Sequence, residues 1–150
     1  MARVAYTAEF DPMITARGMA VEVEVSPKHA REIAHTIKGM SIDRARSFLE
    51  EVIALKTSVP MKRFKKGVAH RRGGVGPGRY PQKCAREFLK LLKNVEANAE
   101  YKGLDVRRMR IVHACTKEGR TIEAIFPRAR GRVTPKRRET VNIELVIQEV

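Results

Sequence analysis

Two segments of this chain are dense in positive charge and contain no acidic residue. Residues 60–80, "PMKRFKKGVAHRRGGVGPGRY", carry seven lysines and arginines, and residues 128–138, "RARGRVTPKRR", carry six. Together they account for nearly all of the formal net charge of +14, since the rest of the chain is close to balanced. Like charges at this density repel one another, so each segment needs counter-charge from outside. We expect a polyanionic partner, either a nucleic acid or an anionic membrane.

The remainder of the chain has the composition of one ordinary globular domain. Its 150 residues and 43% apolar content are enough to bury a single core, made mainly of aliphatic side chains because only 5% of residues are aromatic. No apolar run is long enough for a transmembrane helix, and the N-terminus lacks the apolar segment of a signal peptide. Two isolated cysteines, Cys84 and Cys115, suit buried thiols in a reducing cytoplasm.

The chemistry-bearing residues do not form the spacings of an active site. His29 and His35 are six residues apart, which misses the i, i+4 spacing of a helical metal pair. His113 and Cys115 would share a strand face, but no second pair completes a metal site. The glycines of residues 72–78 are not followed by the Lys-Ser/Thr of a phosphate-binding loop. We therefore expect no enzyme activity, no cofactor and no small-molecule substrate.

Start and stop signals predict three helices. Ser26 and Pro27 have the residue types of an N-cap and a first helical position, and Gly39 suits a left-handed C-terminal cap. Ser41 begins the second helix, and Pro81 begins the third after the long basic loop of residues 60–80. Each helix has one apolar face.

Three stretches have the patterns of strands. In "MAVEVEVS" the alternation predicts that Met19, Val21, Val23 and Val25 face the core. Residues 107–126, "RRMRIVHACTKEGRTIEAIF", are rich in strand-forming residues, and residues 140–150, "TVNIELVIQEV", alternate apolar with polar. The simplest arrangement is an α+β domain in which a three-stranded antiparallel sheet is covered on one face by three helices.

The last two strands predict a long extended β-hairpin. We divide the single domain of residues 1–150 into an N-terminal arm (1–18), a globular body (19–118 and 140–150) and an extended hairpin tip (119–139). A strand from Met109 to Phe126 would be about 60 Å long at roughly 3.3 Å per residue. A two-stranded ribbon is marginal in water, so an external partner must order its outer half.

The apex of that hairpin has its own pattern. If the chain is extended there, Arg128, Arg130 and Arg132 lie on one face and offer a ladder of guanidiniums for phosphates. Pro127 and Gly131 indicate a kinked, tight apex with a positive φ or a close backbone approach at the glycine.

Three stretches resemble the large-ribosomal-subunit protein 22 family in its archaeal and eukaryotic branch. They are "IKGMSIDRARSFLEEV", "LLKNVEANAEYKGLD" and "PRARGRVTPKRRETVNIELVI", and the similarity extends over about residues 19–147. The basic loop of residues 60–80 looks like the insertion that distinguishes this branch from the bacterial one. The closing signature departs from the family at Glu123, where a basic or amide residue is usual, which argues against a phosphate contact at that position.

The resemblance implies a structural constituent of the large ribosomal subunit. Its members place a small α+β body beside the polypeptide exit, while the long hairpin threads through ribosomal RNA and forms part of the exit-tunnel wall. The implied partners are large-subunit ribosomal RNA, neighbouring ribosomal proteins and the nascent polypeptide, in the cytoplasm and without a membrane.

The residues expected to bind RNA combine this resemblance with the charge pattern. They are Lys62, Arg63, Lys65, Lys66, Arg71, Arg72, Arg79, Arg120, Arg128, Arg130, Arg132, Lys136, Arg137 and Arg138. The expected tunnel-lining tip is Phe126, Pro127, Arg128, Ala129, Arg130, Gly131 and Arg132.

Without the resemblance, two other functions stay open. A DNA-binding or chromatin protein would show the same bulk charge, although a sequence-reading one normally offers a basic helix for the major groove. A membrane-surface protein usually has an apolar anchor or amphipathic helix beside its basic segment. Here both basic segments are loops or ribbon containing glycine and proline, which favours RNA.

Overall fold

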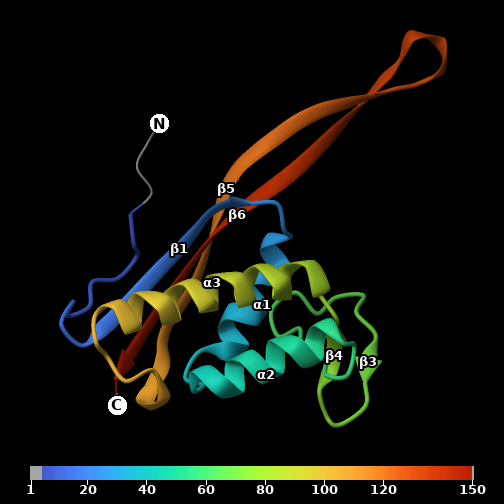
Figure 1. Ribbon diagram of the computed structural model, residues 1–150. Coiled ribbons are helices and arrows are strands. Elements are labelled where there is room, and N and C mark those ends of the chain that lie inside the picture. The colour runs from blue at the N-terminus through green and yellow to red at the C-terminus, as the bar shows by residue number, and fades with distance from the viewer. Residues whose placement is uncertain (1–4, 150) are drawn as a thin grey trace.

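In the computed structural model, which describes residues 5–149, a three-stranded antiparallel sheet lies at the centre of the fold (Figure 1). Its strands are β1 (Thr15–Val23), β5 (Met109–Pro127) and β6 (Val133–Glu149), in the order β1-β6-β5. β5 and β6 are long enough to leave the body together as a two-stranded ribbon, whose apex lies far from the helices. The α+β fold, the sheet and the long hairpin predicted from the sequence are confirmed.

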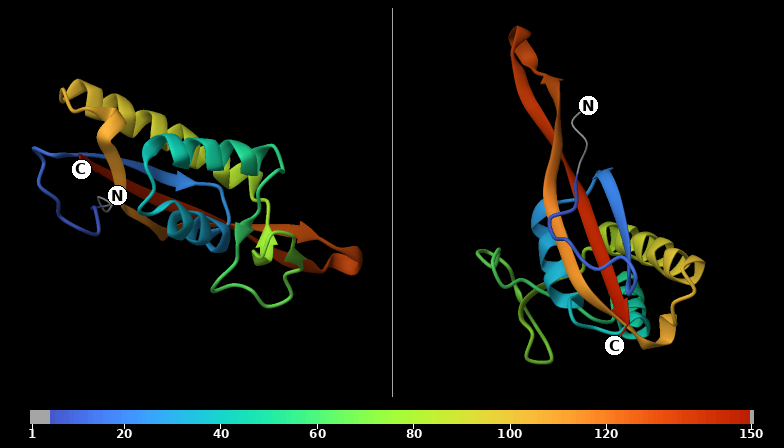
Figure 2. Two further views of the ribbon diagram at one scale, coloured as in Figure 1. Left: turned by 90° about the horizontal axis from the view of Figure 1, so that it is seen from below. Right: turned by 90° about the vertical axis from the view of Figure 1, so that its left-hand side faces the viewer.

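Three helices cover one face of the sheet (Figure 2): α1 (Pro27–Ile37), α2 (Ile42–Ile53) and α3 (Gln82–Tyr101). Their start and stop signals acted as predicted. Ser26 and Ser41 are the N-caps of α1 and α2, Pro27 begins α1, and Gly39 has a φ of +87° just after it. None of these helices is long and apolar enough to cross a membrane.

β1 presents a different face to the core from the one predicted. Ala16 and Gly18 are buried, whereas Val21 is 52% exposed and Met19 is only half-buried. Gly18 allows α3 to approach closely, because a Cβ there would lie 2.5 Å from Cγ2 of Val95. The prediction that Met19 and Val21 point inward was therefore wrong.

A β-bulge explains the error. Ala20 pairs with Ile143 and Val23 pairs with Val141, so β1 contains one more residue than β6 over this interval. The extra residue reverses the alternation, which returns Val23 and Val25 to the core as predicted. Glu22 has a φ of 54° in the bulge, and its N–H donates to Oδ1 of Asn142 at 2.8 Å.

The N-terminal segment lies against the sheet on the face opposite the helices (Figure 2). Thr7 donates to the carboxylate of Glu144 from both its backbone N–H (2.9 Å) and its hydroxyl (2.8 Å). Lys117 forms an ion pair with the same carboxylate at 2.6 Å and donates to the carbonyl of Ala5 at 2.7 Å. Central strand β6 is consequently buried on both faces from Thr140 to Ile147, although its sequence alternates apolar with polar residues.

Residues 1–18 thus contribute to two parts of the described structure. Residues 15–18 pair in β1 and residues 5–14 precede the sheet, while residues 1–4 of the expected arm lie outside the described residues.

The basic loop forms a small sheet of its own. Its strands are β2 (Val59–Pro60), β3 (His70–Arg71) and β4 (Gly76–Arg79), in the order β2-β4-β3. A short 3₁₀ turn, Val106–Arg108, precedes β5, and a tight turn at Ala129–Gly131 forms the hairpin apex.

Candidate nucleic-acid interface

The hairpin leaves the body at a bulge around Gly119. The register shifts between Glu118 and Thr121, and the hydroxyl of Thr140 donates to the carbonyl of Arg120 at 2.6 Å across this point. A Cβ at position 119 would lie 2.6 Å from that hydroxyl, so glycine is required for the close approach. Beyond the bulge every residue from 120 to 139 is exposed except Lys136, which is half-buried. The ribbon therefore has no support from the described part of its own domain.

Most of the basic residues of segment 128–138 lie on β6 or at the apex. Arg138, Arg137 and Lys136 pair with Ile122, Glu123 and Ala124 of β5, so successive cations point to opposite faces of the ribbon. The ammonium of Lys136 lies 4.5 Å from the centroid of the Phe126 ring. Cations are thus available on both faces.

The apex is a tight turn, not an extended segment. Arg128 donates its backbone N–H to the carbonyl of Arg132 at 2.8 Å, and Arg132 donates back to Ala129 at 3.4 Å. Both central residues have positive φ, 58° at Arg130 and 69° at Gly131, which is the pattern of a type I′ turn. The positive φ predicted for Gly131 is confirmed.

The expectation of an extended guanidinium ladder was wrong, because the chain reverses between Arg128 and Arg132. Arginine at position 130 also adopts the left-handed region, which the sequence did not indicate. The three arginines therefore surround a turn and are not aligned along one strand face.

Glu123 lies beside a cation on the neighbouring strand. Its Oε1 is 3.4 Å from Nε of Arg137, and both side chains are more than 70% exposed. Segment 128–138 contains no acid of its own, but the paired strand supplies this one. An exposed pair of this kind contributes little to stability. The ribbon remains strongly basic because its lysines and arginines outnumber its acids.

The basic loop is attached to the body by a buried carboxylate. Glu32 on α1 is fully buried, and its two oxygens accept the backbone N–H groups of Lys62 (3.1 Å) and Arg63 (2.9 Å). Arg31 contacts the same carboxylate at 3.2 Å. Because these bonds use backbone groups, the side chains of Lys62 and Arg63 remain exposed.

The ionised form of Glu32 is favoured at this position. Burial by itself raises the pKa of a carboxyl group, but the N–H groups of residues 63, 62 and 64 and the charge of Arg31 outweigh it and lower the pKa of Glu32. A fixed negative charge therefore lies directly beneath the start of the basic loop.

All seven lysines and arginines of the loop have exposed side chains. Arg71 is the most constrained of them: its Nε donates to the carbonyl of Gly78 at 3.2 Å, and its guanidinium lies 5.2 Å from the centroid of the Tyr80 ring. The loop thus contains a small sheet, and its cations are exposed on the strands and on the segments that connect them.

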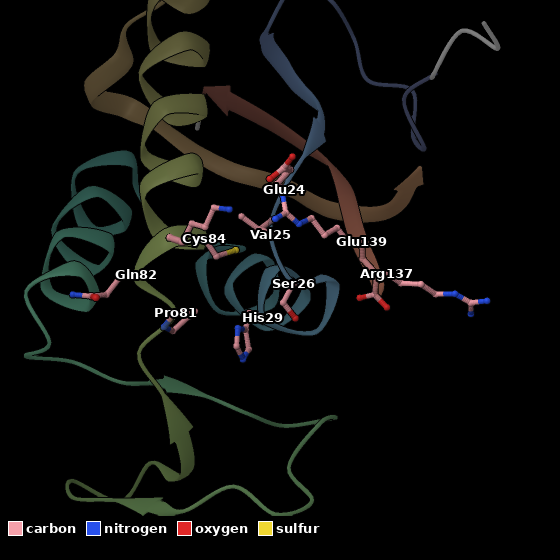
Figure 3. Close-up of a pocket in the computed structure, with 11 residues that line it drawn as sticks. Glu24, Val25, Ser26, His29, Pro81, Gln82, Cys84, Arg137 and Glu139 are labelled. Carbon is pink, nitrogen blue, oxygen red and sulfur yellow. The ribbon is translucent and has the colours of Figure 1, made fainter. Parts of the chain in front are cut away.

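A cavity of 860 Å³ lies where the hairpin meets the body, between the starts of α1 and α3 and strand β6 (Figure 3). Its lining residues include Arg137 and Arg138 of the hairpin and Lys83 of α3. Glu24 and Glu139 line the same cavity, so its charge is mixed. Arg137 points away from it toward solvent, whereas His29 projects from α1 (Figure 3).

Sequence reasoning missed two cations on α1. Lys28 and Arg31 lie within 5.9 Å of the centroid of the Phe64 ring, on the side where the basic loop meets the helix. The first turn of α1 contains no acid, although the helix dipole favours one there. Basic residues at a helix N-terminus were the signal that could have identified them.

The other chemistry-bearing residues have structural surroundings. His113 and Cys115 do share a face, beside Glu144 and Thr7, but the part of the chain described by the structure has no group of three metal-binding side chains. Burial, and to a lesser extent Glu87, raise the pKa of Cys84 to about 12, so its thiol is neutral near pH 7.

The comparisons with known proteins agree with these features. Residues 18–148 match the family model described as ribosomal protein L22p/L17e. The chain is 52% identical to the large ribosomal subunit protein uL22 of Methanocella arvoryzae and 53% identical to that of Methanoculleus marisnigri, in each case over all of this chain and 99% of the relative. It is 46% identical to the protein of the same name from Methanocaldococcus jannaschii, over 99% of this chain and 97% of the relative. The chain therefore belongs to the ribosomal protein L22p/L17e family.

Proposed function

We propose that this chain binds large-subunit ribosomal RNA through its hairpin and its basic loop, supports subunit assembly, and contributes its hairpin to the wall of the polypeptide exit tunnel. Membership of a family of ribosomal proteins already makes it a structural component of the ribosome in the cytoplasm and not an enzyme. The proposal adds which surfaces make the contacts and what they touch: ribosomal RNA, neighbouring ribosomal proteins and, at the apex, the nascent polypeptide.

The observation that carries this proposal is the unsupported ribbon. Residues 120–139 are exposed almost throughout, and the larger apolar side chains among them are open to solvent, with Ile125 67% and Val133 58% exposed. A ribbon of this length that buries so little apolar surface is marginally stable in water. Because it carries many cations, phosphates bound around it would stabilise the paired strands. RNA folded around it would supply both the counter-charge and the missing contacts.

The placement of the cations favours RNA over duplex DNA. The fourteen basic residues proposed to bind RNA all lie outside the three helices, on the basic loop, the ribbon and its apex. A sequence-reading DNA protein normally offers a basic helix for the major groove, and none of these residues lies on an α-helix. Here a narrow ribbon with cations on both faces fits between RNA segments, where it is surrounded by phosphates.

The apex would face the tunnel. In this proposal Phe126, Pro127, Ala129 and Gly131 form the narrow end of the ribbon, with Arg128, Arg130 and Arg132 around the turn. The tight turn keeps the apex only two strands wide, which suits passage between RNA helices. Support comes from this geometry together with the family resemblance.

Binding measured as a function of salt tests the proposal. The full chain is mixed with protein-free large-subunit ribosomal RNA, duplex DNA of matched length, or anionic vesicles at one salt concentration, and then across 50 to 200 mM salt. If about six to ten phosphates are contacted, affinity for the ribosomal RNA falls about 10³- to 10⁵-fold over this range. Preference for duplex DNA or vesicles, or a flat salt response, would overturn the proposal.

A variant locates the binding surface. Replacing Arg128, Arg130 and Arg132 together with glutamine should reduce the salt slope by about one for each phosphate that the arginines neutralise in the wild-type complex. Replacing Arg44, Arg86 and Arg107 together with glutamine is the matched control, since these three exposed arginines lie outside both basic segments and the change in charge is the same. An equal effect of both variants would mean that binding depends on total charge alone.

A further inference from the structure

A second cavity, of 420 Å³, lies between the first turn of α1 and the basic loop. Five of its lining residues are basic: Lys28 and His29 from α1, and Arg63, Lys66 and Arg79 from the loop. Among the described residues no acid lines it, in contrast to the mixed charge of the larger cavity beside the hairpin. Lys28, Arg63, Lys66 and Arg79 are the cations of this lining. The carboxylate of the buried Glu32 beneath the loop is already bonded to backbone N–H groups and Arg31, so the lining favours an anionic occupant.

The wall of this cavity is apolar. Met61, Phe64 and Val68 line it, with Met61 only 4% exposed and Phe64 half-buried. Phe64 also lines a neighbouring hollow of 270 Å³, together with Lys28 and Arg63. The lining of the cavity therefore combines one aromatic side chain, Phe64, with several basic side chains.

The aromatic ring is held in position by its neighbours. Arg63 lies 5.8 Å from the ring centroid, and the backbone N–H of Arg63 donates to the buried carboxylate of Glu32. Anchoring of this kind restrains the backbone immediately before Phe64, which reduces the ordering that a ligand would have to impose on this part of the loop.

Two polar groups at the start of α1 remain available to a ligand. Ser26 is the N-cap residue, but its side chain forms no capping hydrogen bond to the described helix. Burial, and then the charge of Arg79, lower the pKa of His29, which keeps the imidazole neutral near pH 7 and able to accept or donate a hydrogen bond. Figure 3 shows both side chains at this end of α1.

We propose that this cavity binds a single unpaired nucleotide of RNA, with its base stacked on Phe64 and its phosphate among Lys28, Lys66 and Arg79. Its volume is within the range of small-molecule sites, and unpaired bases are characteristically bound by stacking on aromatic side chains beside cations. This inference rests on the RNA-binding function proposed above. It adds that the basic loop recognises an extruded base as well as the phosphate backbone.

Photo-crosslinking provides the first test. The full chain is bound to protein-free large-subunit ribosomal RNA, irradiated with ultraviolet light, digested and examined by mass spectrometry. The expected result is a nucleotide attached within the peptide that contains residues 61–68, at Phe64 or an adjacent residue. Crosslinks confined to the hairpin, with none in this peptide, would overturn the inference.

Two conservative variants provide the second test. Phe64→Leu keeps an apolar side chain but removes the aromatic face, and should weaken binding to the ribosomal RNA at least about 5-fold with an unchanged salt slope. Lys66→Gln should instead reduce the salt slope by about one. Tyr101→Leu is the aromatic control, since Tyr101 is 94% exposed at the far end of α3.

The outcomes separate this inference from the function on which it rests. If the wild-type chain binds the RNA with a steep salt dependence but Phe64→Leu binds equally well, the nucleotide site is wrong and the RNA-binding function stands. If the wild-type chain does not bind the RNA, both are wrong. Far-ultraviolet circular dichroism and a matched unfolding midpoint show whether each variant retains the fold, and Phe64→Tyr, which keeps the aromatic face, should restore the affinity.

Discussion

The carboxylate of Glu32, buried in α1, accepts a hydrogen bond at 2.9 Å from the backbone N–H of Arg63, the second basic residue of the loop. The negative charge of Glu32 is therefore bonded to the backbone of the loop. The lysine and arginine side chains of the loop remain exposed and can bind a partner. The same carboxylate also accepts the N–H of Lys62. One buried acid thus connects the helical layer to a surface of opposite charge.

Replacing this acid by its amide tests the connection. In Glu32→Gln one acceptor oxygen becomes a donor, so one of the two loop N–H groups loses its partner. A buried unsatisfied group of this kind costs about 1–3 kcal/mol. We expect a lower free energy of unfolding in urea and faster amide exchange at residues 62 and 63. Glu50→Gln, at an exposed position on α2, is the control, and equal stability of the two variants would contradict the anchoring role.

Acid should weaken the attachment of both the loop and the N-terminal segment. Burial raises the pKa of Glu144, but hydrogen bonds from Lys117 and Thr7 outweigh it, so its pKa is lowered, as is that of Glu32. Lowered folded-state values mean that the stabilisation is complete above the unfolded pKa of about 4.3 and is lost as the pH falls below it. The free energy of unfolding measured from pH 6 to pH 3 should therefore decrease, and less steeply in Glu32→Gln and Glu144→Gln. Parallel curves for all three proteins would contradict this.

Gly131, which has a positive φ, and Gly18, which packs closely against α3, should respond differently to substitution. Gly131→Val places a β-branched residue at a φ of +69° in the apex, where no atom of the described residues lies within 4 Å of the added Cβ. We expect the thermal unfolding of the body to change little while incorporation into large subunits is impaired. Gly18→Ala is the contrasting variant, because its Cβ would clash with Val95, and it should lower the free energy of unfolding by about 1–3 kcal/mol. Unfolding of the whole domain by Gly131→Val would contradict the position of this residue at the apex.

The two thiols should differ in reactivity. Cys84 is 3% exposed with a pKa of about 12, whereas Cys115 is half-buried near the N-terminal segment. Because the thiolate is the reactive form, iodoacetamide at pH 8 should alkylate Cys115 well before Cys84 in the folded protein. Mass spectrometry of tryptic peptides checks the order, with urea-unfolded protein as the control in which both react. Fast alkylation of Cys84 in the folded chain would contradict its burial.

Local signals in the sequence were sufficient to predict the helices and the hairpin. Ser26, Pro27 and Gly39 act within one turn of the chain, so their effect does not depend on the rest of the fold. The alternation of apolar and polar residues in β6 likewise predicts a strand without knowledge of the strands that pair with it. The uncompensated charge of residues 60–80 and 128–138 identified the surfaces now proposed to bind RNA.

Several features that the sequence did not predict depend on contacts between distant segments. The bulge that reverses β1 is stabilised when Asn142, on another strand, accepts the N–H of Glu22. Glu32 and Glu144 look like surface acids in the sequence, because their burial depends on N–H groups and a lysine far along the chain. The cavity beside Phe64 forms only where the basic loop meets α1.

Hydrogen exchange of the hairpin amides tests the central claim, that RNA orders the ribbon. The strands are paired from Thr121–Glu139 to Pro127–Val133, but these hydrogen bonds lie in an exposed ribbon whose opening costs little free energy. In the free protein we expect protected amides in α1, α2 and α3 and nearly unprotected amides from Gly119 to Glu139, with protection appearing on binding to large-subunit ribosomal RNA. Strong protection across the ribbon in the free monomer, unchanged by RNA, would contradict the account.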